Sequence, residues 1–292
     1  MSSSNKICFF DIIIIAVFSV IAFLMIFPLW KVLMTSLADT KSIAENPILI
    51  WPDKFDLNAY RMIFSTNQIL TSLGVTIFVT IFGVIYNLSL TLTLGYGLSI
   101  RELPGRRFFI TFVLVPFFFT AGLIPYYLQV KNLGLINSVF AMIIPLGING
   151  WYLIVIKNFF QEIPTAMRES AKIDGANDLV IFSTIVLPLS KAVIATFLLF
   201  YAVDRWNEWW HAMMFINDSN KRPLQSILRE LVFLSTSSSG MAASYRRLTG
   251  AYVNDESVKM ATAVITIVPI LCLYPFLQKY FVKGIMIGAV KG

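Results

Sequence analysis

The chain has 292 residues, of which 57% are hydrophobic and 13% are charged, and its net charge is +7. Soluble domains carry about 25% charged residues, so this composition excludes an ordinary soluble domain and predicts a membrane protein. The basic residues form no dense run, so we expect cationic membrane-flanking loops and no nucleic-acid-binding patch.

Six segments are long and apolar enough to cross a membrane, for which about 20 helical residues are needed. They are residues 9–35, 70–99, 108–128, 138–160, 190–215 and 260–281. The apolar part of the first segment is longer than that of a signal peptide, and no small-residue cleavage site follows it, so we expect it to be retained. The sequence therefore predicts an all-α membrane protein with six transmembrane helices.

The segments that connect these spans differ in charge. Residues 1–8, 100–107, 161–189 and 282–292 would lie on one side of the membrane, and they include short basic clusters. Basic residues in short loops favour the cytoplasm, whereas long loops such as 216–259 have little influence on orientation. We therefore expect both termini to be cytoplasmic.

The connection at residues 161–189 is longer and more charged than a simple turn requires. Pro164 suits the first turn of a helix, and Thr165 to about Ile173 can continue it. Gly175 can end that helix in the left-handed conformation, and Asn177 or Asp178 can cap the next one. The sequence thus predicts two short helices on the cytoplasmic side.

The first of these helices has a face of small residues that a partner groove could accept. That face consists of Ala166, Met167, Ser170, Ala171 and Asp174. The alternative is a surface helix in the lipid headgroups, which a basic and strongly amphipathic stretch would favour. Because acidic and basic residues alternate here and the apolar face is small, docking to a partner is the interpretation that we prefer.

The same residues carry a family resemblance. Glu169-Ser170-Ala171, Asp174-Gly175-Ala176 and Ile185-x-Leu187-Pro188 together resemble the EAA loop of ABC importer permeases, with Ser170 in place of an alanine. The last fifteen residues, 278–292, resemble the tail of permeases of the maltose-transporter type. Residues 36–39, 51–52 and 223–225 look most like the branch that takes up polysaccharides, including alginate and pectin-derived oligosaccharides.

This resemblance implies an ABC importer type I permease fold with a short cytoplasmic coupling helix, in the inner membrane of a bacterium. It implies an N-terminal helix and first periplasmic loop at 1–69, a core permease domain at 70–281 and a cytoplasmic tail at 282–292. The implied partners are a homologous second permease in a heterodimer, two copies of a cytoplasmic ATPase and an extracytoplasmic solute-binding protein. The implied coupling residues are Glu169, Ser170, Ala171, Asp174, Gly175 and Ala176. The implied cargo is carbohydrate, and we expect it to be an oligosaccharide.

The chain contains no Gly-x-x-x-x-Gly-Lys-Ser/Thr phosphate loop, so we expect ATP and Mg²⁺ to be bound by the partner subunits and this chain not to be an enzyme. It has one histidine, His211, and two cysteines, Cys8 and Cys272, so we expect no metal site and no other cofactor. The alternative function is an ion- or proton-coupled secondary transporter. That class predicts ionisable residues near several span centres and an inverted repeat, and neither is clear in this sequence.

Residues 204–211 place charged and aromatic side chains together in the fifth predicted span. If this segment is helical, Asp204 and Glu208 share a face, with Arg205 beside them. Aromatic surfaces and polar side chains suit sugars, so this cluster is our candidate for the substrate path, and an aromatic belt at the membrane interface is the equally weighted alternative. The candidate residues are Asp204, Trp206, Asn207, Glu208, Trp209 and Trp210.

Overall fold

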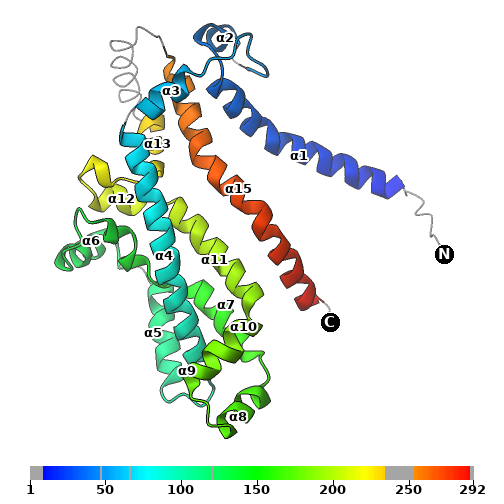
Figure 1. The fold of residues 1–292 in the computed structure, drawn as a ribbon, viewed down its shortest axis with the longest axis vertical. Helices are drawn as coiled ribbons and strands as arrows, with labels where there is room; N and C mark the ends of the chain where they lie inside the picture. The colour runs from blue at the N-terminus through cyan, green and yellow to red at the C-terminus, as the bar shows by residue number, and fades with distance from the viewer. Residues whose placement is uncertain (1–8, 47, 66, 120, 234–252, 290–292) are drawn as a thin grey trace. The chain divides into compact units, whose positions relative to one another are not determined.

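The computed structural model describes residues 9–289 apart from 47, 66, 120 and 234–252, and it describes no side chains for residue 9 or beyond residue 272. The described residues form helices and one isolated bridge between Ala38 and Phe55, with no longer strand (Figure 1). Cys8, the predicted cytoplasmic segment 1–8 and much of the long outer loop lie outside the described residues. The chain divides into two compact units, Met1–Thr66 with Leu228–Val268, and Asn67–Ile227 with Pro269–Gly292.

The first unit contains α1, α2 and α3, the end of α13 and the start of α15. Their bounds are α1 Phe9–Ser36, α2 Thr40–Glu45, α3 Asn58–Ser65, α13 Leu224–Phe233 and α15 Asp255–Ala289. Most apolar side chains of α1 are exposed within the chain. The Ser36 Oγ lies 2.8 Å from the Tyr60 hydroxyl oxygen, and this hydrogen bond joins the end of α1 to α3. Asp39 caps α2 by accepting a hydrogen bond from the Ser42 backbone N–H, and hydrogen bonds from Ser42 hold the pKa of Asp39 below its usual range.

The second unit contains the remaining helices. Their bounds are α4 Asn67–Ser99, α5 Arg106–Phe118, α6 Leu123–Asn132, η1 Val139–Met142, η2 Ile144–Leu146, α7 Gly150–Gln161, α8 Thr165–Ile173, α9 Asp178–Ile181, η3 Phe182–Val186, α10 Leu187–Leu189, α11 Lys191–Trp206, α12 Trp210–Phe215 and η4 Ser219–Lys221. Of these, η3 is a π-helical turn and η1, η2 and η4 are 3₁₀ turns.

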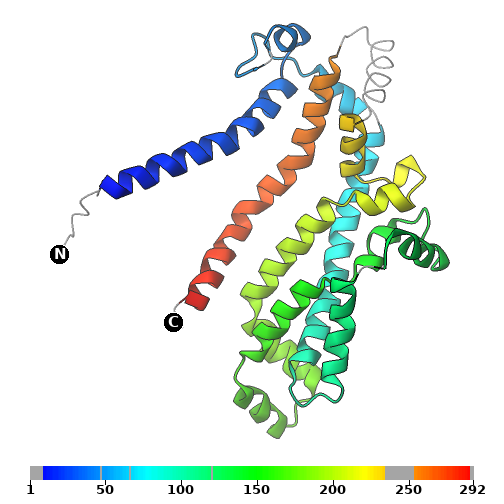
Figure 2. The ribbon, with the colours of Figure 1, turned by 180° about the vertical axis from the view of Figure 1, so that it is seen from behind.

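Helix α4 is the centre of the second unit, where it packs against α7 and α11 (Figures 1 and 2). The apolar core between these helices includes Val84, Leu88, Leu92, Tyr96, Ile156, Phe160, Phe197 and Tyr201. Polar residues of α4 also bond to neighbouring segments. The buried Asn87 donates from Nδ2 to the Leu146 and Gly147 carbonyls, and the Thr91 hydroxyl lies 2.7 Å from the Tyr201 hydroxyl. These side chains therefore join helices together in the interior of the bundle.

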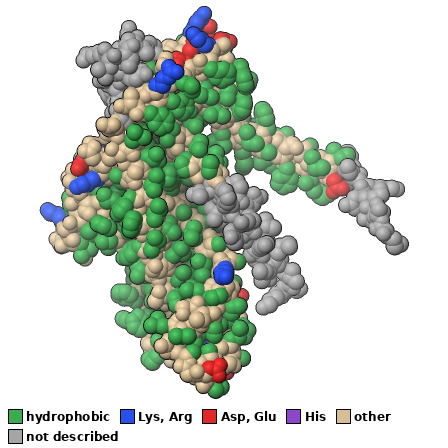
Figure 3. All heavy atoms as spheres, viewed as in Figure 1, with side chains coloured by type: hydrophobic (Ala, Val, Ile, Leu, Met, Phe, Trp, Pro, Cys, Tyr) green, Lys and Arg blue, Asp and Glu red, His purple; other side chains and the backbone are tan. Residues whose placement is uncertain are grey.

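The outer faces of α4 and α5 in this unit are strongly apolar. Hydrophobic side chains cover much of the visible face of the second unit, whereas charged ones are few there (Figure 3). Exposed members on these two helices include Leu70, Ile77, Ile81, Phe108 and Phe112. A face of this composition suits contact with lipid or with another membrane subunit.

Two described helices, α1 and α4, are each long and apolar enough to cross a membrane. Three bent helix pairs reach that length only when the two members are counted together, including η1–η2 with α7 and α9–α10 with α11, which are bent by 47° and 84°. The latter half of α15 lies where side chains are not described, and the count of six spans stays a prediction.

The predicted fifth span, 190–215, is not one continuous helix. Helix α11 has 16 residues, so it is about 24 Å long and shorter than a hydrocarbon core of about 30 Å. It ends at Trp206, and α12 begins at Trp210. The prediction was wrong here because apolar composition alone does not reveal a break that buried polar contacts stabilise.

Candidate functional site

The helical insert has the local structure that the sequence predicts. Helix α8 covers Thr165–Ile173, and Gly175 follows it with φ = 83°. The Gly175 N–H donates to the Lys172 carbonyl at 3.1 Å, and the Ala176 N–H donates to the Ala171 carbonyl at 2.9 Å. These two bonds form a Schellman motif, in which a glycine in the left-handed conformation satisfies the last carbonyls of the helix.

A second short helix then starts from a capped position. The Asn177 Oδ1 accepts a hydrogen bond from the Val180 N–H at 2.9 Å, so Asn177 is the cap of α9. The chain continues through the π-helical turn η3 and α10, and bends sharply at Ser190 before α11. The predicted pair of short helices, the glycine stop and the cap are confirmed.

The side chains of the insert divide between an inward and an outward face. Ala171 and Ala176 are half-buried and pack against the apolar core between α4 and α7. On the outer face, Ile173 is 86% exposed and Leu179 is 74% exposed. The remaining expected coupling residues, Glu169, Ser170, Asp174 and Gly175, are exposed as well. Ile173 and Leu179 are therefore the most uncovered of the large apolar side chains that the insert exposes, and Met167, Val180 and Leu189 are exposed to a smaller extent.

Charged groups of the insert contact one another and α4. The Lys172 Nζ lies 3.3 Å from the Asp178 Oδ1, and both side chains are about half exposed, so this ion pair contributes little stability. The Arg168 guanidinium lies over the ring of Tyr96, with 5.6 Å between its Cζ and the ring centroid. Tyr96 is near the end of α4 and is buried, so the insert is tied to the central helix of the unit.

The candidate substrate path lies at the break between α11 and α12. Because α11 ends at Trp206, Glu208 is not on the same helix as Asp204, and the expected shared face of these two carboxylates does not form. Their side chains have separate partners. The Asp204 Oδ2 accepts a hydrogen bond from the Tyr152 hydroxyl of α7 at 3.0 Å.

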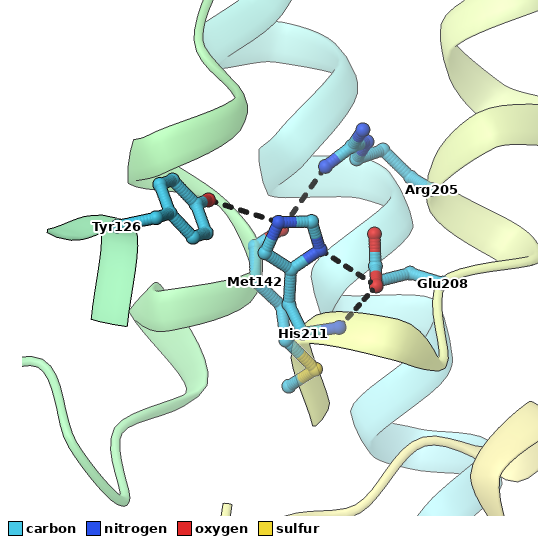
Figure 4. Close-up of polar contacts among 5 residues, drawn as sticks. All are labelled: Tyr126, Met142, Arg205, Glu208 and His211. Atoms are coloured by element: carbon cyan, nitrogen blue, oxygen red, sulfur yellow. Dashed lines mark hydrogen bonds and ion pairs between the residues drawn. The ribbon is translucent and has the colours of Figure 1, made fainter. Parts of the chain in front are cut away.

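Arg205 is buried beside this break. Its Nη1 donates to the Met142 carbonyl of η1 at 3.1 Å (Figure 4). Its aliphatic stem passes directly over Gly83 of α4, where a Cβ atom would lie 2.7 Å from the Arg205 Cδ. The glycine thus provides the space that allows a long charged side chain to lie between two helices.

Glu208 and His211 form a buried pair that connects the break to α6. The Glu208 Oε1 accepts hydrogen bonds from the His211 backbone N–H at 2.9 Å and from its Nδ1 at 3.0 Å. The His211 Nε2 lies 2.9 Å from the Tyr126 hydroxyl oxygen (Figure 4). A carboxylate can only accept, so we assign the proton of a neutral His211 to Nδ1, and the Tyr126 hydroxyl then donates to Nε2.

The expected substrate-path residues differ in how accessible they are within this chain. Trp206 and Glu208 are 7% and 8% exposed, whereas Asn207 is exposed. Asp204, Trp209 and Trp210 are half-buried. Among these residues, Asn207 is the one that offers an accessible polar group, and its Oδ1 accepts a hydrogen bond from the Gln225 Nε2 at 2.9 Å.

Sequence reasoning missed the partners that hold both regions in place. These are Tyr96 for the insert, and Tyr126, Met142 and Tyr152 for the broken segment. Each lies at least 52 residues from its partner in the chain, so no local pattern could have revealed it. Among the described side chains, no group of three or more His, Cys, Asp or Glu residues is placed to hold a metal ion.

Comparison with known proteins decides the family. Residues 90–287, which include the insert and the broken segment, match the family described as binding-protein-dependent transport system inner membrane component. The chain belongs to this family. It is therefore an inner-membrane permease component of an ABC transporter. This family membership does not favour the alternative function, an ion-coupled secondary transporter.

Relatives of known name cover nearly the whole permease. Protein LplC of Bacillus subtilis is 43% identical over 97% of this chain and 95% of its own length. The polygalacturonan/rhamnogalacturonan transport system permease protein YtcP of the same organism is 43% identical over 97% of this chain and 98% of its own length.

A solved structure shares the fold. It is the crystal structure of a bacterial ABC transporter involved in the import of the acidic polysaccharide alginate, in which the matched chain is 30% identical. The match covers 96% of this permease and 99% of that chain, with a TM-score of 0.88. The all-α importer-permease fold implied by the EAA-like motif is thus confirmed. Membership in this family also implies that an ATPase and a solute-binding protein are partners of the permease.

Proposed function

We propose that this permease imports carbohydrate, specifically oligosaccharides of the alginate or pectin type. The support comes from one relative that is 43% identical and is named as a permease for polygalacturonan and rhamnogalacturonan, and from one solved structure that is 30% identical and belongs to an importer of alginate. Both cargoes are acidic polysaccharides. Uptake of labelled uronic and neutral oligosaccharides by the complete transporter tests this, and import of neutral sugars alone would contradict the uronic part of the proposal.

ATP hydrolysis, in this proposal, takes place on two copies of a cytoplasmic ATPase subunit that bind ATP and Mg²⁺. A second, homologous permease completes a heterodimer, and an extracytoplasmic solute-binding protein delivers the sugar. Both termini and the insert face the cytoplasm. The segment 1–69 forms the N-terminal helix and first periplasmic loop, 70–281 forms the core permease domain with its coupling loop at 161–189, and 282–292 forms the tail.

The insert is the coupling element of this proposal, and one observation carries it. Ile173 and Leu179 are large apolar side chains, and the chain leaves 86% and 74% of them uncovered on a segment otherwise fixed by a Schellman motif and a cap. A rigid segment with exposed apolar side chains is suited to insertion into a groove of another protein. The coupling residues are Glu169, Ser170, Ala171, Asp174, Gly175 and Ala176.

Substitution of the exposed apolar side chains tests the coupling element. Ile173→Asp should abolish co-purification of the ATPase, because it places a charge in the proposed groove. Leu133→Asp is the matched control, since Leu133 is also exposed, at 57%, but follows α6 and lies far along the chain from the insert. Retention of the ATPase by Ile173→Asp would exclude the insert as the docking segment.

The substrate path of this proposal passes the break between α11 and α12. Its residues are Asp204, Trp206, Asn207, Glu208, Trp209 and Trp210, with the buried Trp206 and Glu208 supporting the others. We expect Asn207→Ala and Trp209→Ala to reduce sugar uptake while the complex still assembles. Met213→Ala, which truncates an exposed residue of α12, is the control, and uptake equal to that control would remove Asn207 and Trp209 from the path.

A further inference from the structure

The aromatic ring of Tyr96 contacts both halves of the insert. On one side the Arg168 Cζ of α8 lies 5.6 Å from the ring centroid. On another side the ring of Phe182, in η3, has its centroid 5.0 Å away with an angle of 32° between the planes. Tyr96 itself is 7% exposed and belongs to the apolar core of α4.

The hydroxyl of the same residue extends these contacts to α9. It donates to the Asp178 Oδ1 at 3.5 Å, and the Lys172 Nζ lies 3.3 Å from that oxygen. Arg168 and Lys172 are four residues apart, so they share one face of α8. From that face, Arg168 contacts the ring of Tyr96 in α4, and Lys172 contacts the carboxylate of Asp178 in α9.

The contact with the Tyr96 ring is important for the Arg168 guanidinium, because one of its nitrogens has no hydrogen-bond partner in the described part of the chain. Its Nε is buried and has no hydrogen-bond partner among the described residues. A guanidinium over an aromatic face is attracted by the ring quadrupole, and this attraction strengthens as water is excluded. The contact with Tyr96 is therefore an important interaction of this charge with the end of α4.

We propose that Tyr96 and Arg168 are positioning residues that lock α8 and α9 into one body with the inner end of α4, so that a displacement of α8 moves α4. This inference rests on the proposed coupling function of the insert. Without the lock, the motion would have to pass through the packing of Ala171 and Ala176 against the core, the Schellman turn at Gly175 and the half-exposed ion pair. The ATPase would then still bind and hydrolyse ATP, but less of its motion would reach the bundle.

The experiment uses the complete transporter in proteoliposomes and measures ATP hydrolysed per sugar imported. Tyr96→Leu keeps an apolar side chain of similar reach in the core but removes the ring, and Arg168→Gln removes the cation. We expect each to raise the ratio about fivefold, the factor that corresponds to a contact of about 1 kcal/mol. A residue needed only for folding would lower hydrolysis and import together and leave the ratio unchanged.

Two comparisons sharpen this test. Thr93→Val is the matched control, because Thr93 is exposed on α4 less than one turn before Tyr96 and its side chain bonds only within α4. Tyr96→Phe keeps the ring and loses only the long hydrogen bond to Asp178, so its ratio should lie much nearer to the wild-type value than that of Tyr96→Leu. If Tyr96 and Arg168 act as one contact, the double variant should resemble either single variant.

Three results separate the possibilities. If Tyr96→Leu and Arg168→Gln have the wild-type ratio, or if their effects add, the lock is refuted. Should Tyr96→Leu fail to assemble, Arg168→Gln decides alone, since Arg168 is only half-buried. Normal ATPase binding by Ile173→Asp would refute the coupling function itself, which is a separate outcome from an unchanged ratio in the Tyr96 and Arg168 variants.

Discussion

Gly83 makes a sharp test of the packing around the buried arginine. Alanine at this position would place its Cβ 2.7 Å from the Arg205 Cδ and 2.9 Å from its Cγ. Both atoms belong to the stem of a side chain whose Nη1 is held by the Met142 carbonyl. The methyl therefore displaces the stem and weakens a hydrogen bond of a buried charge.

The magnitude follows from two opposing effects. Overpacking in a core costs about 1–3 kcal/mol, whereas replacing a glycine inside a helix with alanine gains about 0.5–1 kcal/mol. We expect Gly83→Ala to lower the free energy of unfolding by about 1–2 kcal/mol. Gly74 lies on the same helix, and an alanine Cβ there would have no heavy atom within 4 Å, so Gly74→Ala should be neutral or stabilising by up to about 1 kcal/mol.

The assay is thermal unfolding of the purified permease in detergent, followed by tryptophan fluorescence. For a chain of this length the two alanine variants should differ in midpoint by about 2–5 °C. Arg205→Ala removes both clashing atoms, so adding Gly83→Ala in that background should cost nothing further. A Gly83→Ala variant that unfolds at or above the wild-type temperature would show that the arginine stem does not occupy this space.

Two further outcomes are expected. Tyr126→Phe leaves the buried His211 Nε2 without its hydrogen-bond donor, so it should lower the free energy of unfolding by about 1–3 kcal/mol in the same thermal assay. Tyr127→Phe is the control and should change little, because the ring of Tyr127 keeps its packing against Phe215. Equal midpoints for the two variants would contradict the hydrogen bond between Tyr126 and His211. Gly175→Ala and Gly134→Ala both place a side chain on left-handed backbone, at φ = 83° and 69°, so each should lower the free energy of unfolding by about 1–2 kcal/mol. Only Gly175→Ala should raise the amount of ATP hydrolysed per sugar imported. An equal ratio in both variants would show that Gly175 has no role in coupling.

The insert was the part of the site most open to prediction. Its helix, its glycine stop at Gly175 and its cap at Asn177 are consecutive along the chain, and each depends on bonds between residues at most five positions apart. The EAA-like motif then pointed to the family that the comparisons show. What this stretch could not reveal is Tyr96, which lies 72 positions before Arg168 and contacts it only because α4 and α8 meet in the fold.

The broken fifth segment shows the opposite case. Its apolar composition predicts one long helix, and the pair Asp204 and Glu208 looks like a shared helical face. The break at Asn207 instead depends on buried polar groups that find partners in η1, α6 and α7. Leaving such groups unpaired would cost several kcal/mol in an apolar interior. Ending the helix early gives hydrogen bonds to the Arg205 Nη1, the Glu208 carboxylate and the His211 ring, although the buried Arg205 Nε has no partner among the described residues.

By itself, the sequence determined a helical membrane protein with two short capped helices between apolar segments, because composition and local capping signals act over a few residues. The EAA-like motif added the resemblance to importer permeases. Only the tertiary structure decided which side chains contact one another: Arg205 over Gly83, His211 between Glu208 and Tyr126, and Arg168 on Tyr96. The physical reason is that each of these contacts joins segments brought together by helix packing, and the desolvation of a charge depends on that packing and not on its neighbours in sequence.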